Sequence, residues 1–414
     1  IPQKSKPIFF FGWYLVAGSF ITNLALTGTY FQGFQVFFLP ILTTFGWSRT
    51  ALSGVFTLRQ LESGLIAPIL GFLVDSLGPR RMITMGGALA GLGFIILSHS
   101  TSLFWFYVIF LFASIGASGA SHGITWPVVI AKWFRRKLGM ALGIATMGPF
   151  LSGVPVMITT WLVMRTDWQT TMTITGVSLL IIIIPIGIMV RNSPEPYGLL
   201  PDGETPDKAI ENNYHEKSDS NGLSVQQAVK QKSFWLNLIF FGAFFFGNSG
   251  FGVHQIPFFE SRGLSTSEAA STLTILLLLS GIGRLGGGIL ADYFEVHYIL
   301  GLMAVLNLIT WLYLIFVDTD TLFIALPFTL IHGIAFGFGV SLRPVIVTRL
   351  FGTQALGAIN GLFQTGMVIS GVIGPVLMGR IFDVTGEYTQ ALYYFSVVAA
   401  MLIPLTWTIR VPKP

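Results

Sequence analysis

Residues 71–81 read GFLVDSLGPRR, and residues 286–296 read GGGILADYFEV. Each stretch contains a lone aspartate at the end of an apolar run, and these aspartates, Asp75 and Asp292, lie 217 residues apart. The same offset aligns other residues, including Gly46 with Gly263, Pro127 with Pro344 and Phe134 with Phe351. Glycine and proline determine backbone shape more strongly than other residues do. The alignment therefore indicates that the chain is built from two similar halves.

The composition places these halves in a membrane. Hydrophobic residues make up 53% of the 414 residues and charged residues only 10%, whereas charged residues are about a quarter of a soluble domain. Crossing a bilayer takes about 20 apolar residues. Twelve apolar runs predict transmembrane helices near 11–38, 50–74, 82–99, 103–131, 138–163, 170–190, 234–259, 267–291, 297–317, 321–348, 356–381 and 388–409. Because the runs are long and continuous, the alternating strands of a transmembrane β-barrel are excluded.

The predicted fold is therefore an all-α integral membrane protein, with twelve helices in two six-helix bundles related by a pseudo-twofold axis. Its parts are an N-terminal bundle at 1–191, a linker at 192–232 and a C-terminal bundle at 233–414. Secondary transporters have this duplicated architecture, with the substrate site between the halves. The linker is rich in proline and mixed charge, so we expect partial disorder, a short amphipathic helix near 224–229 and no chemical role.

Basic residues orient the bundle. Sixteen lysines and arginines fall on the side of both termini and the linker, and four fall on the other side. By the positive-inside rule, both termini and the linker are cytoplasmic in a multi-pass protein of the cell membrane. The net charge of +5 then follows from topology and implies no nucleic-acid partner. We expect a monomer in the lipid bilayer, without a cleavable signal peptide because the first apolar run is long and more spans follow.

Several kinds of chemistry are excluded. The chain has no cysteine, which rules out disulfides, thiolate catalysis and cysteine metal sites. The sequence contains no phosphate-binding loop, metal-ligand cluster or nucleophile triad, and its glycine-rich stretch at 281–288 lies inside a predicted span. We therefore predict no enzyme activity, no cofactor and no metal.

The sequence resembles the major facilitator superfamily over essentially its whole length. GFLVDSLGPRR is similar to the signature loop between the second and third helices of that superfamily, and GRLGGGILADYF at 283–294 is similar to its second copy between helices eight and nine. Within the superfamily, the chain resembles the branch of monocarboxylate transporters and oxalate/formate antiporters. The residues that carry this resemblance are Gly12-Trp13, WFRRKLGMALGIA at 133–145, Arg284 and GRIFDVTGEY at 379–388. The resemblance implies alternating access by rocking of the two bundles.

The signature loop has a physical rationale as a conformational gate. The gate residues that we expect are Gly71, Asp75, Arg80, Arg81 and Asp292. The Asp75 carboxylate can pair with basic loop residues and with the N-termini of neighbouring helices in one conformation only. We therefore expect Asp75 to act as a latch, whereas Arg81 could equally serve only to anchor the topology.

Ionisable residues inside the spans indicate the kind of substrate, because each costs about 2.5 to 3.5 kcal/mol to insert. Three arginines, Arg59, Arg284 and Arg343, outnumber a single glutamate, Glu62. A cationic interior attracts anions, and the planar guanidinium group matches a carboxylate. In the resembled branch the helix-eight arginine binds the substrate carboxylate, which implies this role for Arg284. The alternative is a structural ion pair.

The other charged interior residues each allow two interpretations. Arg343 departs from the resembled branch. Either it helps to bind a dicarboxylate or functionalised acid, or it extends toward the cytoplasm or pairs with an acidic group. His332 lies eleven residues earlier on the same helical face, which predicts that both line the cavity. Arg59 and Glu62 lie three residues apart, and either they form ion pairs or Glu62 carries a co-transported proton. The branch has a lysine in helix one or eleven that is absent here, so an arginine replaces it or the substrate has one strong anionic contact.

Four further residues complete the expected substrate site: His122, Tyr30, Asn248 and Trp126. Histidine can carry a proton or donate a neutral hydrogen bond near physiological pH. The sequence thus predicts a secondary active transporter of small mono- or dicarboxylates, by proton-coupled symport or anion exchange. The alternatives are an efflux pump for amphipathic compounds, in which Arg284 is structural, and a membrane sensor or scaffold that does not transport.

Overall fold

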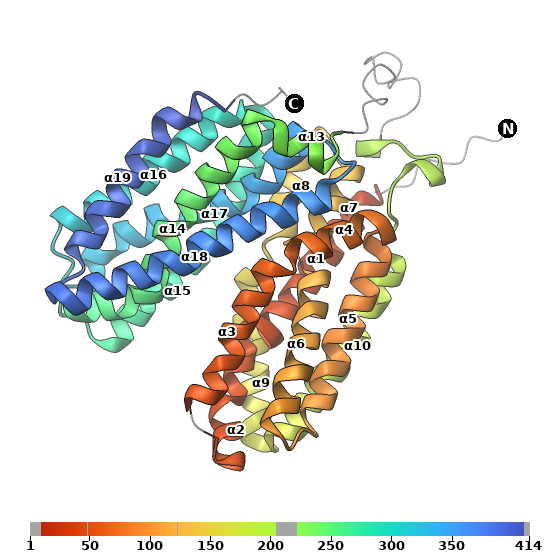
Figure 1. The fold of residues 1–414 in the computed structure, drawn as a ribbon, viewed down its shortest axis with the longest axis horizontal. Coiled ribbons are helices and arrows are strands. Elements are labelled where there is room, and N and C mark those ends of the chain that lie inside the picture. Colours follow the sequence, from red (N-terminus) through yellow and green to blue (C-terminus); the bar gives the residue numbers. More distant parts are fainter. Residues whose placement is uncertain (1–9, 48, 122, 204–221, 410–414) are drawn as a thin grey trace.

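The computed structural model describes residues 10–47, 49–121, 123–203 and 222–409. All regular structure among them is helical (Figure 1). The middle of the linker, where we expected disorder, and His122 lie outside these residues.

The N-terminal half contains six spans, several of them broken. The first begins as α1 (Gly12–Leu26) and continues through a π-helical turn η1 (Thr27–Phe31), a 3₁₀ turn η2 (Gly33–Phe37) and α2 (Phe38–Phe45). The second consists of α3 (Arg49–Leu65) and α4 (Ala67–Leu77), which are bent by 50° at their junction. The other four are α5 (Pro79–Leu97), α6 (Leu103–Ala120) with α7 (Thr125–Trp133), α8 (Leu138–Ala145) with η3 (Gly148–Leu151) and α9 (Gly153–Arg165), and α10 (Trp168–Met189).

The C-terminal half consists of six long helices. They are α14 (Lys232–Ser261), α15 (Thr266–Tyr293), α16 (Val296–Phe316), α17 (Leu322–Phe351), α18 (Leu356–Thr385) and α19 (Thr389–Thr406). The linker carries two short 3₁₀ turns, η4 (Glu195–Tyr197) and η5 (Pro201–Gly203), and the helix α13 (Val225–Lys230). Ser224 and Gln227 form a capping box at the start of α13, which explains why so short a helix begins there.

The twelve-helix prediction is confirmed. Ten helices among the described residues are long and apolar enough to cross a membrane, and the bent α3–α4 pair makes an eleventh span. The twelfth is the first span, which is divided into short pieces and extends to Phe45 rather than to the predicted residue 38. The other expected ends agree with the structure to within a few residues.

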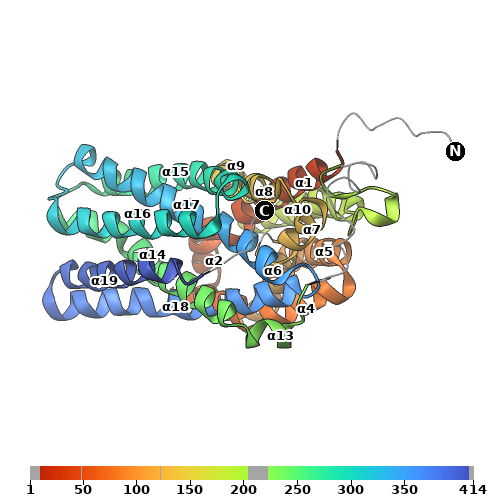
Figure 2. The same ribbon diagram turned by 90° about the horizontal axis from the view of Figure 1, so that it is seen from above.

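The two halves pack mostly within themselves and meet at one end of the molecule. The most extensive contacts between them are two crossings, α4 with α18 and α8 with α15, and α3 also contacts α18 and α8 also contacts α17. Figure 1 shows the halves meeting at the end that carries α13 and α7 and diverging toward the other end. Figure 2 shows α14 to α19 on one side and most of the N-terminal half on the other. We call the joined end the linker end.

Glycines allow the two crossings at the linker end to be close. A Cβ atom on Gly71 of α4 would overlap the carbonyl oxygen of Gly357 in α18, and one on Gly288 of α15 would overlap that of Gly139 in α8. Small residues let helix backbones approach in this way. Gly71 and Gly288 are repeat partners, so both crossings follow from the internal duplication.

Candidate functional site

A cavity of about 340 Å³ lies between the two halves. The N-terminal half lines it with Thr27, Phe31, Ser63, Leu70, Ser118, Ser121, Gly123, Ile124 and Pro149. The C-terminal half lines it with Phe245, Arg284, Phe336, Gly339, Val340, Arg343, Gln364 and Met367. The walls are therefore largely apolar, with hydroxyl groups on one side and two guanidinium groups on the other.

Arg284 projects from α15 and is 8% exposed. Its Nη1 donates a hydrogen bond of 2.5 Å to the carbonyl oxygen of Thr146, across the interface between the halves. Its Nε has no hydrogen-bond partner among the described residues. The glycines around it serve close packing, since a Cβ on Gly283 would overlap the backbone of Ile334 in α17.

Arg343 projects from α17 into the same cavity and is 7% exposed. Its Nη1 donates to Oε1 of Gln364 at 2.7 Å and to the sulfur of Met367 at 3.1 Å, both on α18. Its Nη2 donates to the carbonyl oxygen of Gly123 at 3.4 Å, in the other half. Arg343 is thus held inside the cavity, which excludes the alternative that it extends out of the span.

Breaks in the N-terminal helices supply the carbonyl oxygens that accept from both arginines. An unbroken helix would pair the Gly123 carbonyl with the N–H of residue 127, but that residue is proline and has none. The Thr146 carbonyl would pair with the N–H of Phe150, but that N–H donates instead to the carbonyl oxygen of Met147, just before the turn η3. The acceptors described for both arginines are therefore neutral, so their charges are not neutralised by a carboxylate among the described residues.

Glu62 of α3 lies just behind the cavity wall and is 3% exposed. Its Oε2 accepts a 2.6 Å hydrogen bond from Ser114 and a 3.4 Å bond from Ser118, while Oε1 has no partner among the described residues. Ser118 also lines the cavity. Arg59 donates to the carbonyl oxygen of Phe31 at 2.8 Å. The structure thus brings a buried carboxyl group within one side chain of the cavity.

Four of the residues that we expected in the substrate site do not line this cavity. His332 stacks on Phe328 and lies edge-on to Trp311, both with ring centroids 5.1 Å away. Arg343 and His332 lie on the same face of α17. At Arg343 that face meets the cavity, whereas at His332 it packs against other helices of the C-terminal half. His122 is not among the described residues.

The other three also point into the interior of a half. Tyr30 stacks on Phe110 at 5.2 Å, and its neighbour Phe31 lines the cavity instead. The indole N–H of Trp126 donates to Ala120 O at 3.0 Å, and Asn248 donates to the carbonyl of Phe244 at 2.6 Å.

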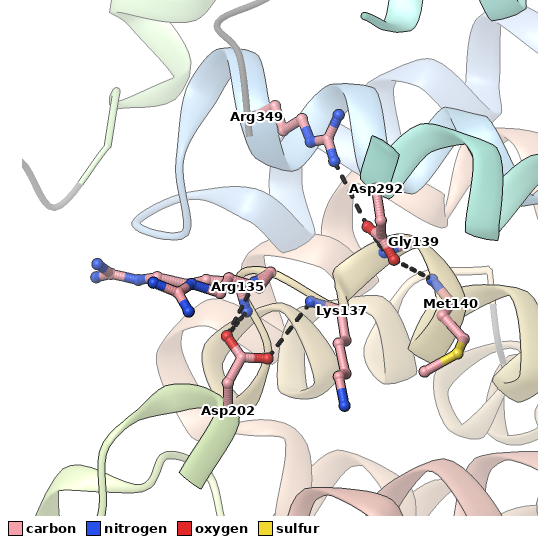
Figure 3. A network of polar contacts seen from close by, with 8 residues as sticks. Arg135, Lys137, Gly139, Met140, Asp202, Asp292 and Arg349 are labelled. Carbon is pink, nitrogen blue, oxygen red and sulfur yellow. Dashed lines mark hydrogen bonds and ion pairs between the residues drawn. The ribbon is translucent and has the colours of Figure 1, made fainter. Parts of the chain in front are cut away.

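At the linker end, two carboxylates bind helix N-termini across the interface. Asp75 accepts from the backbone N–H groups of Gly357 and Ala358, at 3.0 and 2.9 Å, where α18 begins. Asp292 accepts from Gly139 and Met140, at 2.7 and 2.8 Å, where α8 begins (Figure 3). Such positions favour negative charge.

Each carboxylate has a basic neighbour from the same position of the repeat. Arg349 forms an ion pair of 3.6 Å with Asp292. Lys132, exactly one repeat earlier at the 217-residue offset, interacts electrostatically with Asp75. Arg80 and Arg81 are exposed, and the backbone N–H of Arg80 donates to Asn192 at 3.0 Å.

Sequence analysis did not identify the roles of two residues, one at the linker end and one in the cavity. Asp202, in the linker, accepts from the backbone N–H groups of Arg135 and Arg136 at 2.9 Å each and of Lys137 at 3.4 Å (Figure 3). Only the Pro-Asp-Gly sequence, which is typical of a turn, could have drawn attention to it. The contact of Gln364 with Arg343 was not predicted. Charged residues stand out inside a span because they are costly to insert into a membrane, and glutamine is uncharged.

Comparison with known sequences places this arrangement in a family. The sequence profile of the Major Facilitator Superfamily matches residues 15–295 and 246–414. Monocarboxylate transporter 12 of Homo sapiens is 26% identical over 436 residues, covering 97% of this chain and 81% of that protein. Monocarboxylate transporter 13 of Rattus norvegicus is 26% identical over 406 residues, covering 95% and 86%.

Solved structures share the fold. The proton:xylose symporter XylE bound to 6-bromo-6-deoxy-D-glucose has a TM-score of 0.78 at 12% identity, covering 97% of both chains. The major facilitator transporter FucP in the outward conformation has a TM-score of 0.73 at 14% identity, covering 96% of this chain and 98% of that one. The chain is thus a multi-pass membrane transporter rather than an enzyme, and it belongs to the major facilitator superfamily.

Proposed function

We propose that this transporter carries small organic anions through the cavity between its halves. The observation that supports this best is the pair of buried guanidinium groups on Arg284 and Arg343, whose acceptors among the described residues are neutral. A buried cation without a carboxylate partner is costly. An entering carboxylate lowers that cost, so the cavity favours anions over neutral solutes.

The relatives support the same chemical class. Monocarboxylate transporters 12 and 13 carry the substrate class in their names. The second cavity arginine, Arg343, extends the class to small dicarboxylates. Arg284 binds one carboxylate, Arg343 assists, and the hydroxyl groups of Ser63, Ser118 and Ser121 are available to the rest of the substrate.

The linker end is the cytoplasmic end in this proposal, because sixteen of the basic residues outside the spans lie on that side and four on the other. With that end joined, the transporter faces outward. Asp75 and Asp292 form the latch, because their hydrogen bonds to α18 and α8 must break before the two halves can separate there. Residues 1–191 then rock against residues 233–414.

Glu62 is the residue that we assign to proton coupling. It is buried, hydrogen-bonded by two serines, and connected to the cavity through Ser118. A carboxyl group there can load a proton when the cavity is open to one side and release it to the other. Anion exchange without a proton is the alternative driving mechanism.

Uptake into proteoliposomes tests the proposal. Labelled mono- and dicarboxylates are offered with and without a pH gradient to the native protein, to Arg284→Lys and to Arg343→Lys. Arg262→Lys is a matched control, because Arg262 forms an ion pair of 3.3 Å with exposed Asp318 outside the cavity.

We expect saturable carboxylate uptake that is lost in Arg284→Lys, weakened in Arg343→Lys and retained in Arg262→Lys. Dependence on the pH gradient would favour symport, and its absence would favour exchange. If well-folded native protein takes up no carboxylate, the anion proposal fails, and efflux of amphipathic compounds through the apolar walls becomes the leading function.

A further inference from the structure

We propose that the cavity selects organic dianions and that Gln364 sets this preference by holding Arg343 without neutralising it. This inference rests on the proposed anion transport and specifies its substrate class. The described partners of Arg343 are the Gln364 amide oxygen, the Met367 sulfur and the Gly123 carbonyl, and none of them carries a charge.

The nearby carboxylates are engaged elsewhere. Glu62 is hydrogen-bonded to serines of α6, and Asp75 and Asp292 bind helix N-termini at the linker end. Two positive charges therefore face one cavity, and a ligand with one carboxylate would leave one of them uncompensated. Because an unpaired buried charge is costly, the second acid group of a dianion contributes to binding.

The position of Gln364 is where an acidic residue would remove this preference. A glutamate there would form an internal ion pair with Arg343 at the same 2.7 Å contact. Glutamine has almost the same shape as glutamate but no charge, so it fixes the guanidinium group and leaves its charge available. The cavity volume of about 340 Å³ and the rings of Phe31, Phe245 and Phe336 suit a short apolar spacer between two acid groups.

The test compares a dicarboxylate of four to six carbons with its own monoamide, which has the same length and one charge fewer. We expect the native protein to favour the dicarboxylate by about tenfold or more in kcat/KM, the factor that corresponds to about 1.4 kcal/mol. Gln364→Glu should abolish this preference by raising the KM for the dicarboxylate, with little change for the monoamide.

Three further variants make the test specific. Arg343→Gln removes the second cation itself, so it should also abolish the preference for the dicarboxylate. It replaces Gln364→Glu in the test if that variant does not fold. Gln364→Met, which adds no charge, should keep a preference for the dicarboxylate. Gln390→Glu makes the same chemical change at an exposed residue at the start of α19, outside the cavity lining, and it should behave like the native protein.

Equal transport of both compounds by the native protein would overturn the dianion inference, as would an equal loss of both in Gln364→Glu. Uptake of the monoamide alone would also overturn it, yet would leave anion transport intact. Only the absence of uptake of every acid would overturn both proposals together.

A separate observation concerns the linker, and from it we infer that Asp202 is a positioning residue of the Asp292 latch. Asp202 binds the N–H groups of residues 135, 136 and 137, and Asp292 binds those of residues 139 and 140. In Figure 3, the Asp202 carboxylate lies at the turn that precedes α8, and the Asp292 carboxylate lies at the start of α8 itself. One comes from the linker and the other from the opposite half.

The linker is fixed firmly enough for this role. The Arg191 guanidinium lies between the rings of Phe11 and Tyr197, 4.2 and 4.1 Å from their centroids, and the Trp133 indole donates to the Arg191 carbonyl at 3.0 Å. Asp202 itself has a φ of 59°, a left-handed conformation that is unfavourable for most residues other than glycine. Its three hydrogen bonds offset that cost and orient the turn so that Gly139 and Met140 face Asp292.

A double-mutant cycle tests this role. The chain has no cysteine, so one introduced at Ala358, which is 8% exposed, reports opening of the linker end through its maleimide labelling rate. We expect Asp202→Ala to raise this rate several-fold in the native background and to have no further effect with Asp292→Asn. Asp202→Asn should give a smaller increase, and it replaces the alanine variant if that variant does not fold. Additive effects of the Asp202 and Asp292 changes, or no effect of Asp202→Ala, would overturn the inference.

Discussion

Replacing Asp292 by asparagine should open the linker end more than the same replacement at Asp75. Asparagine keeps one oxygen acceptor but presents an NH₂ group to the second backbone N–H, so each variant loses at least one charge-assisted hydrogen bond, about 1.5 to 3 kcal/mol. Asp292 also forms the 3.6 Å ion pair with Arg349, and both side chains are less than a tenth exposed, at 7% and 8%. Arg349 and Asp292 both belong to the C-terminal half, so this ion pair does not itself cross the interface, but it orients the carboxylate toward the N–H groups of α8. Losing that orientation should cost the joined state about 1 to 2 kcal/mol more.

The difference between the two variants should therefore be about 1 to 2 kcal/mol, which is about 5- to 30-fold in the population of the open state. Labelling rates of cysteines introduced singly at Ala358 in α18 and Ala141 in α8 measure this population, because both positions are buried while the end is joined. Rocking of the halves should expose both thiols together. Asp318→Asn, an exposed carboxylate outside this interface, is the control.

Two results would refute this reasoning. If Asp75→Asn labels as fast as Asp292→Asn, the ion pair with Arg349 does not strengthen the latch. If each variant exposes only the thiol on its own crossing, the carboxylates hold individual helix ends and not the joined halves.

Three further predictions follow from the same structure. Glu62→Gln should abolish the dependence of uptake on a pH gradient while saturable exchange persists, and retained dependence would remove Glu62 from proton coupling. Gly71→Ala and Gly288→Ala should each favour the open linker end by about 1 to 3 kcal/mol, because the added Cβ overlaps the facing backbone; unchanged thiol labelling would show that the crossings can adjust. Arg349→Gln should open this end more than Lys132→Gln, since only Arg349 is within ion-pair distance of its aspartate in the described structure; the opposite order of labelling rates would contradict this.

The architecture was predictable because its causes are local and repeated along the chain. Continuous apolar runs located the spans, and the glycine, proline and aspartate positions of the repeat indicated two similar halves. Arg284 and Arg343 were identified as interior cations because charge is costly in a membrane. Those signals require no knowledge of which helices pack together.

What sequence could not supply depends on long-range packing. His332 shares a helical face with Arg343, but about three helical turns away from Arg343 that face packs among Phe251, Trp311 and Phe328 of its own half. Asp202 gained its partners only when the linker folded back on the turn before α8. Gln364 is uncharged, so only its contact with Arg343 identifies it.

Residues at equivalent positions of the internal repeat are alike at the linker end but differ in the cavity. Asp75 and Asp292, and Lys132 and Arg349, occupy equivalent positions, so both halves contribute similar contacts where the halves are joined. The equivalents of Arg284 and Arg343 are Ala67 and Trp126, and the equivalent of Glu62 is Leu279. The C-terminal half therefore supplies the cavity cations, and the N-terminal half supplies the carbonyl oxygens that receive them and the one buried carboxyl group behind the wall. In the proposed mechanism, the symmetric contacts at the linker end open and close together, and the asymmetric cavity couples the proposed anion on the C-terminal half to the proposed proton on Glu62 of the N-terminal half.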